Sequence, residues 1–198
     1  FHASKGRFKG RATVNRFRIE AHHFVSTVAG YLFDVGIDSP WRVFQRKFDE
    51  VEILIAKNKY ESFGENDGIE GLRVYHEKVL TKILGSCLLR KRQGPVMGVL
   101  EGIWGLVMQF EMLMRNGGKE EEKEVEVREL YQKFAKKVRV FLTVLRGMGE
   151  KIGAGKRDGG SGGGRKGLFD ASELERDAGG EVRILVERLE MSGYYSSR

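Results

Sequence analysis

Apolar residues recur every three or four positions along most of this 198-residue chain, a spacing typical of amphipathic α-helices. Only two prolines, Pro40 and Pro95, interrupt the pattern. No segment shows the sustained alternation of apolar and polar residues, with hairpin turns, that a β-fold requires. The sequence therefore predicts an all-α fold, a helical bundle of about five long helices plus a short C-terminal helix.

Turn and capping residues divide this pattern into separate helices. Ser39 can cap the second helix, and Pro40 fits its first position because proline lacks the N–H that would be unpaired there. Five segments carry stripes long enough for a long helix, and one suits a short helix. We expect these helices at about 13–34, 39–57, 69–92, 96–114, 120–146 and 182–189.

Two of these helices have distinctive compositions. The third ends in three cations, Arg90–Arg92, which would interact favourably with the negative end of the helix dipole. Residues 96–114 are apolar nearly all round, which indicates a helix buried at the centre of a single shared core. A membrane span is the alternative, but Glu101 and Glu111 lie within it, and an acid at the bilayer centre costs about 2.5–3.5 kcal/mol.

The chain organisation follows from these elements. We predict a basic arm or loop at 1–12, a helical bundle at 13–146, a Gly-rich flexible insertion at 147–169, and a C-terminal helix and tail at 170–198 that complete the bundle. Glycine loses much entropy on ordering, so its dominance from Gly147 to Gly167 favours a linker. Asp170 and Glu173 could form a capping box. The chain begins at Phe1 rather than Met, so we expect it to be a piece of a longer protein.

The net charge of +7 is concentrated in one place. Of 35 Lys and Arg, six lie in residues 1–18, which contain no acid, and the other 29 are balanced by 28 Asp and Glu. This basic segment (residues 1–18) predicts a local partner-binding patch. An acidic protein surface, a nucleic acid on which Phe8 stacks, and a solvated loop without a partner all remain open. The candidate partner-binding residues are Lys5, Arg7, Phe8, Lys9, Arg11, Arg16 and Arg18.

The sequence offers no candidate catalytic, cofactor-binding or metal-binding residues. His22 and His23 are adjacent and diverge by about 100° on a helix, so they do not easily share a metal. Gly155-Lys156 is followed by Arg157 where a phosphate-binding loop needs Ser or Thr, and no strand precedes it. Cys87 lies on an apolar stripe, where inert packing is expected. We therefore predict a protein that is not an enzyme and needs no cofactor.

Three segments, in order, resemble the C-terminal region of the γ-tubulin complex component family. They are HFVSTVAGYLFDV at 23–35, YHEKVLTKILGSCLL at 75–89 and LVERLEMSGYY at 185–195. The resemblance covers roughly Asn15 to Tyr195. Gly30, Gly36, Glu190 and Ser192 depart from the family pattern, which indicates a divergent member.

The resemblance implies an elongated α-helical protein that holds γ-tubulin in a microtubule-nucleating complex. Other γ-tubulin complex components would be its partners, with no membrane, and nucleic acid would be the less favoured alternative. The implied location is the cytoplasm and cytoskeleton, at a microtubule-organising centre such as a centrosome or spindle pole body. Because tubulins are acidic, the resemblance also implies an acidic partner for the basic segment. Tyr194 and Tyr195 are expected to pack against the bundle instead of contacting a partner.

Overall fold

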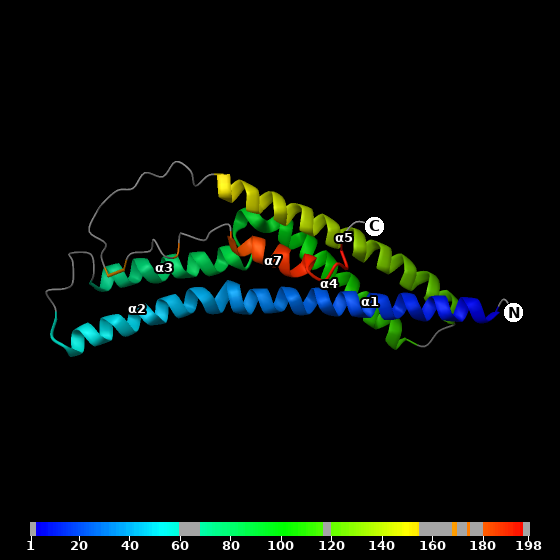
Figure 1. The fold of residues 1–198 in the computed structure, drawn as a ribbon, viewed down its shortest axis with the longest axis horizontal. Helices are drawn as coiled ribbons and strands as arrows, with labels where there is room; N and C mark the ends of the chain where they lie inside the picture. The colour runs from blue at the N-terminus through cyan, green and yellow to red at the C-terminus, as the bar shows by residue number, and fades with distance from the viewer. Residues whose placement is uncertain are drawn as a thin grey trace.

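The computed structural model describes residues 3–59, 68–116, 120–154, 168–169, 174 and 180–195. Every regular element in this part of the chain is helical, which confirms the all-α prediction (Figure 1). The elements are α1 (Ala3–Tyr31), the π-helix η1 (Leu32–Asp38), α2 (Ser39–Ala56), α3 (Ile69–Ser86), the 3₁₀-helix η3 (Lys91–Gln93), α4 (Gly94–Arg115), α5 (Glu120–Ala154) and α7 (Gly180–Glu190).

Residues 3–56 form one continuous helical rod, because η1 joins α1 directly to α2 (Figure 1). Helix α2 begins at Ser39 with Pro40 in its first turn, as predicted, but the expected Ser39 cap is wrong because the residues before it are helical as well. Asp38 has helical dihedrals (φ −65°, ψ −43°), and no side chain caps the helix there. The N–H of Ser39 donates to the carbonyl of Asp34, five residues earlier. This wider π turn leaves room for a proline ring, which would clash in an ordinary α-turn.

From Ala3 onward, the basic segment is also helical. We expected an arm or loop at residues 1–12, but α1 begins at Ala3. Sequence periodicity did not predict a helix in residues 3–12 because this segment has no apolar stripe. Its Ala, Lys and Arg residues nevertheless have high helix propensity. The further division of the chain into bundle, insertion and C-terminal segment stays a prediction.

The described helices share two cores rather than the single core we expected. The main core lies among α1, α4, α5 and α7 and includes the fully buried Phe17, Phe24 and Phe134. The small core lies between α2 and α3, where Tyr75 and Val79 pack with Leu174 and neighbouring residues. The rod α1–η1–α2 runs past both cores and connects them.

Helix α4 is buried on one side only, which corrects the prediction of a helix buried all round. Leu100, Ile103 and Phe110 lie in the main core, whereas Met108 is 62% exposed and Glu101 faces solvent. By length and composition, the segment Ile69–Arg115 contains one stretch that could cross a membrane, but core helices of soluble proteins pass the same test.

Helix α3 ends at Ser86, earlier than residue 92, the predicted end. Leu88 adopts a left-handed conformation (φ 62°), and its burial in the main core offsets this strain. Arg90–Arg92 therefore follow the helix instead of forming its last turn. The Arg90 guanidinium nevertheless folds back and donates to the carbonyl of Thr81 at 3.0 Å, so a cation still lies against the end of α3.

Helix α5 continues to Ala154, into the segment predicted to be a flexible insertion. Met148 packs against the main core, and a Cβ built at Gly149 would lie 3.3 Å from the side chain of Arg183 on α7. These contacts order the first glycines of the tract. Residues 155–167 and the predicted capping box of Asp170 and Glu173 lie outside the described residues.

Candidate partner-binding surface

The predicted partner-binding residues all lie on α1, so the structure brings them together on one helix. Arg11 and Arg18 are exposed and seven positions apart, which puts them on the same face of the helix. Lys5, Arg7, Phe8 and Lys9 belong to the first turns of α1, and their side chains lie outside the description.

Arg16 differs from its basic neighbours because it also has an internal role. Its Nε donates to Glu20 Oε1 at 2.8 Å, and its guanidinium lies 5.4 Å from the centre of the Tyr131 ring. The hydrogen bond to Glu20 is the main cause that raises the pKa of Arg16. Glu20 is only 3% exposed and also accepts the Tyr131 hydroxyl, at 3.1 Å from each carboxylate oxygen. This partly buried cluster fixes α1 against α5.

The C-terminal tyrosines pack on the same part of α1, which confirms the prediction that they contact the bundle. The Tyr195 hydroxyl donates to the carbonyl of Glu20 at 2.8 Å and lies 3.2 Å from His23 Nδ1. Burial raises the pKa of Tyr195 and lowers the pKa of His23. The Tyr194 ring lies 5.2 Å from the His23 ring but stays partly exposed.

A second basic region, on α5, was missed by the sequence reasoning. Residues 130–149 contain five cations and no acid, a signal as visible in the sequence as that of residues 1–18. Arg146 pairs with Glu190 on α7. The other four form no salt bridge with any residue that the structure describes: Lys133, Lys136, Lys137 and Arg139.

A buried polar cluster connects α7 to α3 and α1. Glu181 on α7 forms an ion pair of 2.9 Å with Lys82 and accepts a hydrogen bond from the Ser86 hydroxyl. The Tyr31 hydroxyl in turn donates to the carbonyl of Ser86 at 2.9 Å. Sequence reasoning missed this cluster because its members are up to 150 positions apart and follow no shared motif.

The comparisons with known proteins are decisive for the family. The family model described as gamma tubulin complex component C-terminal matches residues 2–195. The chain belongs to the γ-tubulin complex component family. The comparison with curated proteins and the comparison with solved structures find no significant match.

Family membership confirms the resemblance seen in the three sequence segments. It gives this γ-tubulin complex component chain a role in the γ-tubulin complex and associates it with the microtubule cytoskeleton. The tyrosines of the third segment anchor the chain end on α1, and Tyr31 and Tyr75 from the other two are fully buried.

No group of three or more His, Cys, Asp or Glu among the described residues of this family member could hold a metal ion. The Cys87 thiol is buried, close to Gly36, and burial raises its pKa, so the thiolate that would act as a nucleophile is disfavoured. His76 packs 5.3 Å from the Phe44 ring.

Proposed function

We propose that this chain binds γ-tubulin and acts, as a non-catalytic scaffold, in microtubule nucleation. The observation that carries the proposal is the basic segment of α1 in a member of the γ-tubulin complex component family. Six cations without an acid provide a positive field at one end of the chain. Such a field attracts an acidic tubulin surface and fixes the orientation of the complex.

The structure supports a defined geometry for this contact. Arg11 and Arg18 are exposed on one face, so both are accessible to a partner. Arg16 is held by Glu20 and Tyr131, so it stabilises the helix that presents them. A basic helix fixed on a rigid core loses less entropy on binding than a flexible arm would.

The proposed partners are γ-tubulin and other γ-tubulin complex components, without a membrane or a cofactor. The proposed location is the cytoplasm and cytoskeleton, at a microtubule-organising centre such as a centrosome or a spindle pole body. GTP would belong to γ-tubulin, so this role needs no nucleotide site in the chain itself.

Charge reversal of the basic segment tests this proposal. We expect the triple change Arg7→Glu, Lys9→Glu and Arg11→Glu to weaken γ-tubulin binding by about tenfold or more at low salt, because steering and contact charges are both lost. Biolayer interferometry with purified γ-tubulin measures the change, and circular dichroism checks the helix content.

The matched control reverses three exposed cations outside the segment, Lys57, Lys91 and Arg92. This control variant should bind γ-tubulin like the wild type. Unchanged binding by the Arg7, Lys9 and Arg11 variant, with its helix content intact, contradicts a role for the basic segment.

A further inference from the structure

Helix α5 carries its charges in two blocks of opposite sign. Residues 120–129 contain six glutamates and two cations, whereas residues 130–149 contain five cations and no acid. The sign changes well inside the helix, which runs from Glu120 to Ala154. The helix dipole acts only within the first and last turns of a helix, so it does not account for a change of sign at this point.

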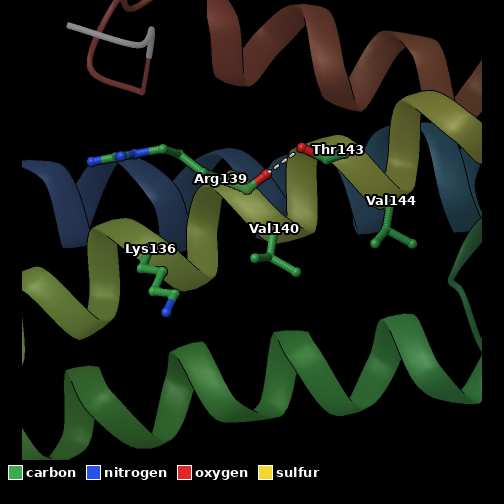
Figure 2. Close-up of a pocket in the computed structure, with 5 residues that line it drawn as sticks. All are labelled: Lys136, Arg139, Val140, Thr143 and Val144. Carbon is green, nitrogen blue, oxygen red and sulfur yellow. Dashed lines mark hydrogen bonds between the residues drawn. The ribbon is translucent and has the colours of Figure 1, made fainter.

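Charges from both blocks lie on one exposed stripe of α5. The stripe residues follow one another at alternating steps of three and four positions, which keeps them on one side of the helix. They are all exposed to solvent, and we call them the α5 stripe: Glu126, Glu129, Lys133, Lys136 and Val140. Figure 2 shows Lys136 and Val140 extending from the same side of α5, whereas Arg139 points away from it.

The four charges of the α5 stripe have no partner of opposite charge in the part of the chain that the structure describes. None of them forms a salt bridge there. Glu124 and Arg128, on another side of the same helix, pair with each other at 3.1 Å. Two hollows of about 300 and 340 Å³ border the stripe, so other described side chains do not cover it. The charges are therefore available to a partner.

The α5 stripe is complementary to itself when it is turned end for end. Glu129 and Lys133 lie two positions on either side of Tyr131, and Glu126 and Lys136 lie five positions on either side. We propose that two copies of this chain associate through antiparallel α5 helices, about a twofold axis level with Tyr131. Glu129 of each copy would then face Lys133 of the other copy, and Glu126 would face Lys136. This interface lies on α5 and is separate from the proposed γ-tubulin contact on α1.

The order of the charges favours this arrangement over the alternatives. A parallel pair of α5 helices would place like charges of the two copies opposite each other, and such charges set the orientation of helix pairs. An anionic membrane or a nucleic acid would be attracted by Lys133 and Lys136 but repelled by Glu126 and Glu129. A second copy of the chain supplies both signs in the required order.

The size of the α5 stripe sets the strength of the contact. From Glu126 to Val140 the stripe is about 21 Å long at 1.5 Å per residue, which is short for a permanent interface. Exposed ion pairs stabilise a complex weakly, so the charges determine the register of the two helices more than their affinity. We therefore expect a weak, reversible dimer that dissociates as the salt concentration rises.

Charge variants of the α5 stripe test this pairing. Variant A carries Glu126→Lys and Glu129→Lys, so its four stripe charges are all positive, and variant B carries Lys133→Glu and Lys136→Glu, so its stripe charges are all negative. Sedimentation velocity of the full chain at submillimolar concentration should show a wild-type dimer at low salt that is lost at about 500 mM salt. Each variant alone should raise the dimer Kd by at least about tenfold, because like charges then face each other.

A mixture of the two variants gives the sharpest result. Equimolar A and B should form a heterodimer at low salt, since every positive stripe residue then faces a negative one. The fourfold variant that combines all these exchanges should self-associate like the wild type. The matched controls make the same charge changes at exposed residues outside α5, as Asp49→Lys with Glu52→Lys and as Lys57→Glu with Lys91→Glu, and should leave the dimer unchanged. Circular dichroism checks the helix content of every variant.

Three results would overturn the proposal. A wild-type chain that stays monomeric at submillimolar concentration and low salt would lack such an interface. Self-association of variants A and B equal to that of the wild type would place the interface elsewhere on the molecule. Folded A and B that do not form a heterodimer when mixed, together with a fourfold variant that stays monomeric, would show that the two stripes do not face each other in antiparallel order.

Discussion

The two ends of this structure carry similar aromatic residues but bury them differently. In the main core, Phe17 and Phe24 are completely buried and contact the Phe134 ring at 5.1 and 6.1 Å. At the other end, Trp41 and Phe48 on α2 flank Phe44 yet stay 39% and 48% exposed. The same kind of side chain is core at one end and surface at the other.

This difference indicates where the folding free energy resides. Apolar burial and close packing stabilise the main core, whereas the small core, among the described residues, joins α2 and α3 with Phe169 and Leu174. Helices with few buried contacts open locally at a lower free energy than the rest of the molecule. We therefore expect a stable base formed by α1, α4, α5 and α7, from which α2 and α3 extend with weaker support.

Truncation of one phenylalanine at each end tests this comparison, and it should give the largest change in the free energy of unfolding. Phe134→Ala should lower the free energy of unfolding by about 3–5 kcal/mol, because it leaves a cavity in the main core. Phe48→Ala, the matched change on α2, should cost less than about 1 kcal/mol because the ring is half exposed. Urea denaturation followed by circular dichroism measures both. Equal losses would contradict the division into a strong and a weak end.

Removal of the buried ion pair between Glu181 and Lys82, which joins the two ends, should give the next largest change in stability. Glu181→Gln should cost about 2 kcal/mol, because it leaves Lys82 buried without a counter-charge. The matched control is Glu190→Gln, whose partner Arg146 is exposed, and it should change stability by no more than about 0.5 kcal/mol. Hydrogen exchange should show loss of protection in α3 for the Glu181 variant alone. Unchanged α3 protection would mean that this cluster does not hold α3 to α7.

The smallest effect is a pH dependence of the main core at His23. Burial, with a smaller contribution from His22, lowers the pKa of His23, so the unfolded chain binds a proton more readily than the folded chain. Stability from this residue is therefore complete above pH 6.5 and decreases as the pH falls below that value. The change in Tm between pH 7.5 and 5.5 should be smaller in His23→Gln than in the wild type. Parallel curves would show that His23 is not linked to folding.

The amphipathic helices could be predicted from the sequence because the apolar residues of each buried face recur every three or four positions within the helix itself. On α1, Phe17, Phe24 and Tyr31 follow one another at steps of seven residues, which puts them on one face, and all three are fully buried. Predictions failed in segments where no such apolar periodicity marks the structure. The first turns of α1 have no stripe, and Pro40 indicates a helix start in most chains but here follows a π turn.

The site could be predicted only in part, for a related reason. Charge runs are visible in a sequence, so the basic segment was identified, and the run on α5 could have been identified by the same count. The cluster of Glu20 and Tyr131 could not, because the two residues are 111 positions apart and meet only through the packing of α1 on α5. Three-dimensional contacts of this kind decide which cations are neutralised and which stay available to a partner.

A parallel titration against γ-tubulin and duplex DNA tests the central claim most directly. The account predicts saturable binding to γ-tubulin that is lost in the Arg7, Lys9 and Arg11 charge-reversal variant, with weak DNA binding. Tight DNA binding together with no γ-tubulin binding would contradict it. In that case the logarithm of the DNA association constant should fall linearly with the logarithm of salt concentration, with a slope of about −0.9 per phosphate contacted.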